Sequence, residues 1–221
     1  NAYLVRVLRL GAGDSVRLFN GRDGEWRAVI SGVARKQLTL TVETQTRAQD
    51  VVPDLWLCAA PLKRGRIDWV AEKACELGVA ELRLVATARS VVDRINLDRL
   101  RAHMVEAAEQ CERTAVPALH DRVPLARMLS EWPDGRQLIY ADETGGEPLA
   151  CARLQPCAAV LIGPEGGFTP AERAAIRAHS ATTAVALGPR ILRADTAAVA
   201  AISLWMARAG DWVDGDAIGC T

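Results

Sequence analysis

Lysine is scarce in this chain, and neither sign of charge is in excess. Of the 27 basic residues among 221, three are lysines and the others are arginines, and 27 acidic residues balance them to a formal net charge of zero. Bulk charge therefore does not attract nucleic acid, and any site for a polyanion must be local. Arginine suits bidentate contacts with phosphates and bases, although a GC-rich genome explains the same bias without any selection for RNA contacts.

Metal and redox motifs are missing as well. The six cysteines form no CxxC pair and do not cluster with histidine, so neither a zinc nor a redox site is predicted, and most cysteines are expected to be buried. No run approaches roughly 18 consecutive apolar residues, and no charged-then-apolar leader is present. We therefore expect a reduced, soluble, cytoplasmic protein with no membrane or metal partner. Because the chain opens at Asn1 inside a strand-like pattern, we also expect part of its first domain to precede it.

Residues 1–50 have the pattern of a small all-β domain. Short alternating stretches are separated by turn dipeptides such as Asn20-Gly21 and Asp23-Gly24, which are typical of hairpins. The predicted strands are YLVRVLRL, GDSVRLFNG, EWRAVISGV and KQLTLTVET. Eight basic and five acidic side chains in this segment give a weak indication of an RNA-facing barrel, and an ordinary solvated surface is the alternative.

Residues 51–221 instead alternate strands with helices, which favours a mostly parallel sheet covered on both faces. Buried strands are predicted at LWLCAAPL, AELRLVA, QLIYADE, AAVLI and TAVALG. Amphipathic or apolar helices are predicted at IDWVAEKACELG, DRLRAHMVEAAEQCER, TPAERAAIRA and DTAAVAAISLWMAR.

A glycine-rich loop, residues 163–168, follows the buried strand at 158–162. Thr169, Pro170 and Glu172 then form a helix-start signature with a capping box. Open α/β sheets bind ligands at the carboxyl ends of their strands, and glycine lets the backbone approach a ligand or adopt a positive φ. The loop matches neither GxGxxG nor a Walker sequence, which disfavours dinucleotides and nucleoside triphosphates. A tight turn without ligand is the alternative.

A second glycine turn, residues 187–193, also follows a buried strand and precedes a helix. Two such loops at one edge of a sheet predict a pocket. Asp195 or Thr196 after this turn is either a helix cap or a catalytic group. Lys63 and Arg66 precede another helix. They either bind phosphate or are solvated surface charges.

Several motifs, in order along the chain, carry a family resemblance. They are EKACELGV, ARSVV, EAAEQCERTAVP, GPEGGFTPAE and LGPRILRADTA, and the start YLVRVLRLGAGD fits the same pattern. Together they closely resemble the RsmE family, which methylates N3 of a uridine in 16S ribosomal RNA. Asp195 stands where many members carry Glu, and the basic leader that usually precedes the first barrel strand is absent.

The resemblance implies a fold, a cofactor and partners. The expected fold is an α/β SPOUT methyltransferase domain with a C-terminal trefoil knot over residues 51–221, preceded by a PUA-like β-barrel that binds RNA over residues 1–50. The implied cofactor is S-adenosylmethionine, and the implied partners are 16S rRNA in the small ribosomal subunit and a second copy in a homodimer. A SPOUT methyltransferase for another rRNA or tRNA position, and a non-catalytic ribosome-assembly protein, are the alternatives.

The resemblance implies the cofactor residues, and the chemistry of N3 methylation and the positions of charged residues suggest the others. The catalytic candidates are Arg193, Arg190 and Asp195, with Glu165 as an alternative proton acceptor, and the RNA-binding candidates are Arg6, Arg9, Lys63 and Arg66. The cofactor is expected to contact Leu161, Ile162, Gly163, Glu165, Gly166, Gly167, Leu187, Gly188, Ile191 and Leu192. In the last helix, we expect one face to pack either against a second subunit in a dimer or against the subunit's own core. This face comprises Ala197, Ala201, Leu204 and Trp205.

Overall fold

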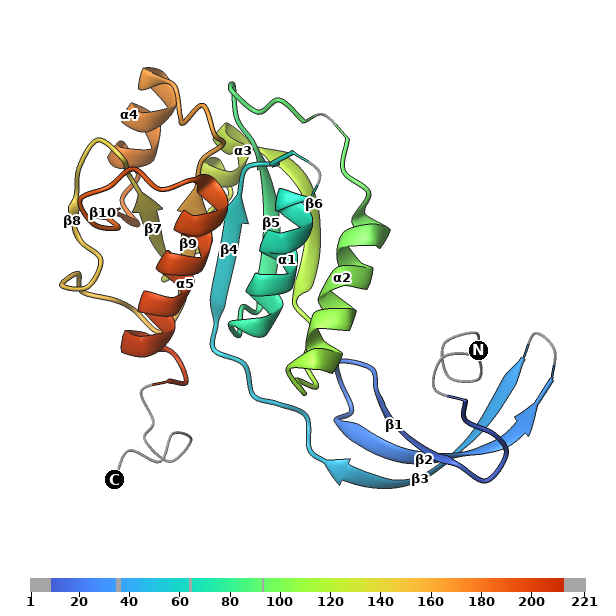
Figure 1. Ribbon diagram of the computed structural model, residues 1–221. Coiled ribbons are helices and arrows are strands. Elements are labelled where there is room, and N and C mark those ends of the chain that lie inside the picture. Colours follow the sequence, from blue (N-terminus) through green and yellow to red (C-terminus); the bar gives the residue numbers. More distant parts are fainter. Residues whose placement is uncertain (1–8, 35–36, 64, 93, 213–221) are drawn as a thin grey trace. The chain divides into compact units, whose positions relative to one another are not determined.

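The computed structural model describes residues 9–34, 37–63, 65–92 and 94–212 (Figure 1). The chain divides into two compact units. The first comprises Asn1–Val51 with Glu112–Ala115, and the second comprises Val52–Cys111 with Val116–Thr221. The sequence expectation for the first domain did not include the short segment 112–115.

The first unit contains a three-stranded antiparallel sheet in the order β1-β2-β3. Its strands are β1 (Ser15–Phe19), β2 (Glu25–Val33) and β3 (Leu38–Arg47). The β1–β2 turn forms because Asn20 Oδ1 accepts hydrogen bonds from the backbone amides of Arg22 and Asp23, both at 3.0 Å. These strands match three of the four predicted ones, and most of the fourth, YLVRVLRL, lies outside the described residues.

Hydrogen bonds attach the segment 112–115 to the first unit. The amide of Thr114 donates to Asp50 Oδ2 at 2.6 Å, and the amide of Asp50 donates back to Thr114 Oγ1 at 2.9 Å. Arg47 also donates to the carbonyl of Glu112. The predicted helix therefore ends before this segment, because these residues pair with the β-unit instead.

The second unit contains a seven-stranded sheet with the order β6-β5-β4-β9-β7-β10-β8, and its paired strands are all parallel. Its strands are β4 (Leu55–Ala59), β5 (Glu81–Ala86), β6 (Ala118–Pro124), β7 (Gln137–Ala141), β8 (Glu147–Pro148), β9 (Ala158–Ile162) and β10 (Thr182–Ala186). The sequence predicted five of these. It missed the outer strands β6 and β8, which are partly or fully exposed and so lack a buried strand's apolar run.

Helices cover both faces of this sheet, as Figure 1 shows. α1 (Arg66–Glu76), α2 (Leu97–Gln110) and α5 (Ala194–Ala209) lie on one face. α3 (Leu125–Ser130) and α4 (Pro170–Ala178) pack on the other through Met128, Ile176 and the core around Tyr140. Among the described helices, none is long and apolar enough to cross a membrane.

Strand β9 lies in the middle of the sheet. Its residues Ala158–Ile162 are all buried, and it pairs with β4 on one edge and with β7 on the other. Leu161 faces the core that also contains Tyr140 and Phe168. The carboxyl ends of β4, β9, β7 and β10 consequently meet at one edge of the sheet.

A buried arginine, Arg136, connects strands at the amino edge of the sheet, opposite the edge where the carboxyl ends meet. Arg136 is 7% exposed, donates to both Asp54 carboxylate oxygens at 2.7 Å, and donates to the Ala158 carbonyl at 2.9 Å. The guanidiniums of Arg136 and Arg83 stack on the Trp56 ring, 3.6 and 3.5 Å from its centroid. These contacts join the starts of β4, β7 and β9.

The cysteines differ from expectation. Cys58 and Cys75 are buried, but Cys111 and Cys151 are exposed and Cys157 is half-buried. The prediction that most cysteines are buried is therefore wrong for the described ones, because three of them lie on loops and helix ends. In the described ranges, no three His, Cys, Asp or Glu side chains are grouped to hold a metal ion.

Candidate active site

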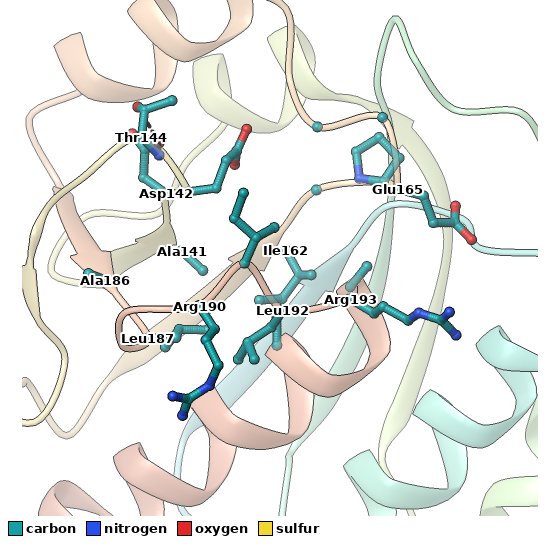
Figure 2. Close-up of a pocket in the computed structure, with 18 of the residues that line it drawn as sticks. Ala141, Asp142, Thr144, Ile162, Glu165, Ala186, Leu187, Arg190, Leu192 and Arg193 are labelled. Atoms are coloured by element: carbon teal, nitrogen blue, oxygen red, sulfur yellow. Dashed lines mark hydrogen bonds between the residues drawn. The ribbon is translucent and has the colours of Figure 1, made fainter.

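A pocket of about 800 Å³ opens at the carboxyl edge of the sheet (Figure 2). Three loops form most of its wall: the first glycine loop (residues 163–168), the second glycine loop (residues 187–193), and a turn at residues 141–145 that follows β7 and is called the acidic turn below. This volume is within the roughly 300–1,000 Å³ of small-molecule and cofactor sites. The two glycine loops therefore do share one pocket, as their positions in the sequence predict.

The first glycine loop is held by hydrogen bonds at both ends. Thr169 and Glu172 form the predicted capping box at the start of α4, with the Thr169 amide donating to Glu172 at 2.8 Å. Glu172 also accepts from the Ala88 amide at 2.7 Å, and Arg89 donates to the Gly166 carbonyl at 2.7 Å. Burial raises the pKa of Glu172, but these amide hydrogen bonds and the Thr169 hydroxyl outweigh burial and lower it.

Two glycines of this loop are required by geometry. Gly167 has a φ of 65°, and a Cβ there would lie 2.9 Å from Glu143 Oε1. A Cβ on Gly163 would lie 2.8 Å from the Phe168 ring. Gly166 has no positive φ, and a Cβ there would make only ordinary contacts, at 3.5 Å, with Arg89. The conformational need for glycine is thus at Gly167 rather than at Gly166.

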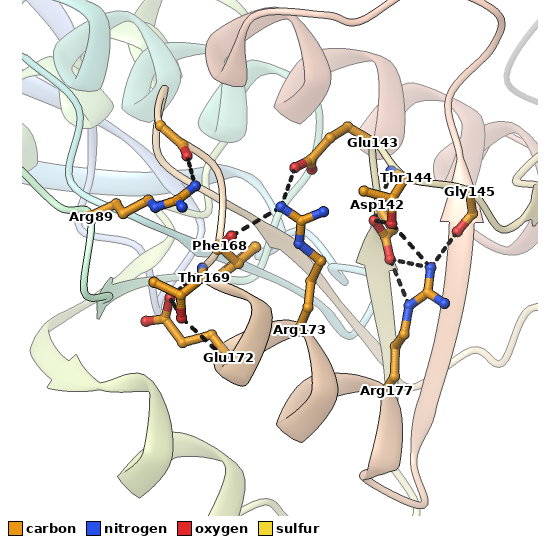
Figure 3. A network of polar contacts seen from close by, with 11 residues as sticks. Arg89, Asp142, Glu143, Thr144, Gly145, Phe168, Thr169, Glu172, Arg173 and Arg177 are labelled. Carbon is orange, nitrogen blue, oxygen red and sulfur yellow. Dashed lines mark hydrogen bonds and ion pairs between the residues drawn. The ribbon is translucent and has the colours of Figure 1, made fainter.

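The acidic turn was not among the predicted site residues. Asp142, whose side chain is fully buried, accepts from Thr144 Oγ1 at 2.7 Å and from Arg177 Nε at 2.8 Å (Figure 3). Arg177, on α4, also donates to the Gly145 carbonyl at 3.0 Å. The signal that finds this turn is the polar, glycine-containing stretch ADETGG directly after the buried strand QLIYA.

A second arginine of α4 joins the acidic turn to the first glycine loop. Arg173 pairs with Glu143 at 3.2 Å and donates to the Phe168 carbonyl at 3.0 Å (Figure 3). Both walls are therefore braced from α4.

The predicted cofactor residues divide into lining and supporting groups. Leu161 is fully buried in the core beneath the pocket and does not line it, because its side chain points from β9 toward Tyr140 and Phe168. Ile191 lines the pocket rim and is 85% exposed. The other predicted residues line the wall: Ile162, Gly163, Glu165, Gly166, Gly167, Leu187, Gly188 and Leu192.

The charged candidates Glu165, Arg66, Arg190 and Arg193 line the pocket, whereas Asp195 does not. Arg66 NH1 lies 3.4 Å from Glu165 Oε1, and Arg66 Nε lies 3.8 Å from Asp195 Oδ2. Asp195 therefore pairs with Arg66, from a segment far away in the sequence. Among the described residues, Arg190 and Arg193 have no side-chain hydrogen bond or ion pair, and Figure 2 shows them extending in different directions from the second glycine loop.

The RNA-binding candidates are only partly described. Arg6 lies outside the described residues. Arg9 is exposed, but it has a φ of 57° and precedes β1, so the prediction that it belongs to a barrel strand is wrong. Lys63 is exposed on the loop after β4, and Arg66 faces the pocket.

The last helix buries part of its predicted dimer face within the subunit. Ala201 and Trp205 are fully buried against the sheet, so core packing accounts for both. Ala197 and Leu204 are half-buried, and Ala197 lines the pocket.

Comparison with known proteins identifies the family. Residues 50–206 match the RNA methyltransferase domain family, and residues 2–43 match the RNA methyltransferase PUA domain family. The ribosomal RNA small subunit methyltransferase E of Rickettsia conorii is 30% identical over 206 residues, covering 91% of this chain and 84% of that protein. This chain belongs to the RsmE family of RNA methyltransferases. The family resemblance, the SPOUT-type parallel sheet and the PUA-like N-terminal domain are thereby confirmed.

Solved structures share the fold of this chain. A Legionella pneumophila protein, named as a methyltransferase and solved in complex with the bound cofactor S-adenosylmethionine, superimposes with a TM-score of 0.84 at 31% identity, covering 93% of this chain and 87% of that one. A ribosomal RNA small subunit methyltransferase E from Neisseria gonorrhoeae shares the fold with a TM-score of 0.82 at 23% identity, covering 92% of this chain and 87% of that one.

We expect Gly167→Val to weaken binding of S-adenosylmethionine about 10- to 100-fold. Valine at a positive φ costs about 1–3 kcal/mol, and its side chain would displace Glu143 from the wall. Isothermal titration calorimetry measures the affinity. Gly166→Ala is the matched control and should change the affinity less than about threefold. An equal loss of affinity in the two variants, or no loss in Gly167→Val, would contradict the conclusion that the pocket requires glycine at position 167.

The Asp142 carboxylate predicts how stability depends on pH. Burial raises the pKa of Asp142, but hydrogen bonds from Thr144 and Arg177 outweigh burial, so its pKa in the folded protein lies below the unfolded value. Its stabilisation is present above about pH 4 and is lost as pH falls through the folded pKa. Asp142→Asn should therefore lower the free energy of unfolding at pH 7 by about 1.5–3 kcal/mol, with a smaller loss at pH 3.

Urea unfolding at the two pH values checks this prediction. Glu131→Gln is the control, because Glu131 forms only an exposed pair with Arg127 on the protein surface and should change stability by less than about 0.5 kcal/mol. An Asp142→Asn loss of equal size at both pH values would mean that the carboxylate's charge is not what stabilises the turn.

Proposed function

We propose that this protein transfers a methyl group from S-adenosylmethionine to N3 of a uridine in 16S rRNA of the small ribosomal subunit. The observation that carries the proposal is a pocket of about 800 Å³ between three loops at the carboxyl edge of the sheet, in a chain of the RsmE family. When bound, the cofactor supplies an electrophilic methyl group on a sulfonium centre.

The residues present fit that cofactor. Ile162, Leu187 and Leu192 give the pocket an apolar wall, and the two glycine loops expose backbone amides and carbonyls. We propose that these backbone groups bind the adenine and ribose. Gly163 and Gly167 allow this wall to pack closely against Phe168 and Glu143.

Methylation of N3 requires loss of the imide proton and accumulates negative charge on the uracil oxygens. Arg193 and Arg190 carry free guanidiniums at the pocket and are proposed to stabilise that charge, as preorganised donors do in other enzymes. Glu165 and Asp195 are the carboxylates proposed to accept the proton. Alignment of N3 with the methyl group supplies roughly 7–11 kcal/mol of the barrier reduction, so the wall's rigidity contributes to catalysis.

The substrate must present an unpaired base. N3 lies on the base-pairing edge of uracil, so the target has to be single-stranded or flipped out of its stack. We propose that Arg6, Arg9 and Lys63 contact the surrounding RNA, that the enzyme acts as a homodimer, and that residues near the second glycine loop form a trefoil knot. The half-buried Leu204 of α5 fits a dimer contact.

Methylation of undermodified small ribosomal subunits tests the proposal. Subunits from cells that lack this modification are incubated with the protein and S-adenosylmethionine, and their nucleosides are analysed by mass spectrometry. We expect 3-methyluridine at one position, and none without the protein or with Gly167→Val at limiting cofactor. A different methylated nucleoside would contradict the target atom, and cofactor binding without methylation of any RNA would contradict the activity.

A further inference from the structure

We propose that Arg66 and Glu165 recognise the base-pairing edge of the target uracil, with Asp195 as the residue that positions Arg66. The inference rests on the proposed function and deepens it by naming the groups that select uracil. Arg66 donates to one uracil carbonyl oxygen, Glu165 accepts from N3–H, and Arg193 donates to the other carbonyl oxygen.

Arg66 and Glu165 line the pocket, and Asp195 lies beside Arg66 without lining it. Arg66 begins α1 after β4, Glu165 belongs to the first glycine loop after β9, and Asp195 lies in the first turn of α5 after β10. Figure 2 shows that Glu165 and Arg193 extend to the same side of the pocket, whereas Arg190 points elsewhere. We propose that the planar base enters on that side, where Glu165 pairs with Arg66 and the Arg193 side chain makes no hydrogen bond among the described residues.

The Arg66 contacts are loose in comparison with the structural arginine pairs of this protein. Arg136 meets Asp54 at 2.7 Å and Arg177 meets Asp142 at 2.6 Å, but Arg66 lies 3.4 and 3.8 Å from its two carboxylates. Its side chain is 37% exposed. A guanidinium has five N–H donors, and Arg66 donates one described side-chain hydrogen bond, from NH1 to Glu165 Oε1. Its other donors are therefore available to a ligand.

The neighbouring charges favour a base over a phosphate at Arg66. A phosphate bound there would lie close to the negative carboxylates of Glu165 and Asp195, which repel it. A neutral uracil edge carries acceptor, donor and acceptor groups at O2, N3–H and O4, and these pair with a donor, an acceptor and a donor. Lys63, exposed three residues before Arg66, forms no ion pair among the described residues and is the better phosphate contact.

The methyl-transfer step balances with these groups. The N3 proton passes to the Glu165 carboxylate, and the N3 electron pair forms the new N–CH₃ bond. The S–CH₃ bond breaks with its electron pair going to sulfur, which becomes a neutral thioether. Arg66 and Arg193 stabilise the negative charge that N3 and the carbonyl oxygens carry during the step.

This arrangement also gives specificity. Cytosine presents acceptors at O2 and N3 and a donor at N4, so it would place an acceptor against Glu165 and a donor against a guanidinium. Donors that face donors, and polar groups left unpaired, disfavour such an analogue. The pocket is therefore expected to exclude cytidine by charge and hydrogen bonding rather than by size.

Single-turnover methylation of small subunits by Arg66→Gln tests the assignment. The expected rate is about 10²-fold below wild type at pH 7, with S-adenosylmethionine affinity and melting temperature unchanged. Raising the pH should recover part of the rate, because N3 ionises in solution. Glu165→Gln should show a similar loss and a larger recovery. Arg127→Gln, which alters only the exposed pair on α3, should match wild type.

The salt dependence of RNA binding separates base recognition from phosphate binding. Lys63→Gln should reduce the slope of log affinity against log salt by about one, and Arg66→Gln should leave it unchanged. A reduced slope for Arg66→Gln with a normal rate at saturating RNA would overturn the inference in favour of a phosphate contact. Loss of cofactor affinity and melting temperature together would overturn it in favour of a structural role.

The wild-type reaction in the same assay separates failure of the proposed base recognition by Arg66 from failure of the proposed function. If wild type forms 3-methyluridine and Arg66→Gln forms it at the same rate, the inference fails and the proposed function stands. If wild type forms none, the proposed function fails and the inference fails with it.

Discussion

Burial of strand β9 is the constraint on which the rest of the second unit depends. Its residues Ala158–Ile162 have no exposed face and hydrogen-bond to β4 and β7 on their two edges. A parallel strand of this kind must have helices on both sides of its sheet. It also brings loops from separate parts of the chain to one edge. The pocket is a consequence of that arrangement, because the polar loops converge where the buried strands stop.

Arginine has two distinct roles in this unit, and geometry separates them. Arg136 and Arg177 form tight pairs with carboxylates, at 2.7 and 2.6 Å, which fix the amino edge and the acidic turn. Arg66 and Arg193 are loosely paired or free at the pocket mouth. The scarcity of lysine therefore does not by itself indicate RNA binding. Arginine stabilises the fold at Arg136 and Arg177, and it is proposed to act on RNA at Arg66 and Arg193.

Periodicity was sufficient to predict the buried elements. The strands that became β4, β5, β7, β9 and β10 stand out because each is a short apolar run, and the capping box at Thr169 fixes the start of α4. Outer strands such as β6 lack that signal, because half of their residues face solvent. The partner of Asp195 and the Arg177 brace were not predictable, since both depend on contacts between segments far apart in the sequence.

Hydrogen exchange with and without S-adenosylmethionine tests most directly whether the three loops form the cofactor site. Bound cofactor should slow exchange of backbone amides in residues 141–145, 163–168 and 187–193, while the outer strand β6 and helix α3 change little. Protection confined to other segments, or no protection at saturating cofactor, would contradict the account.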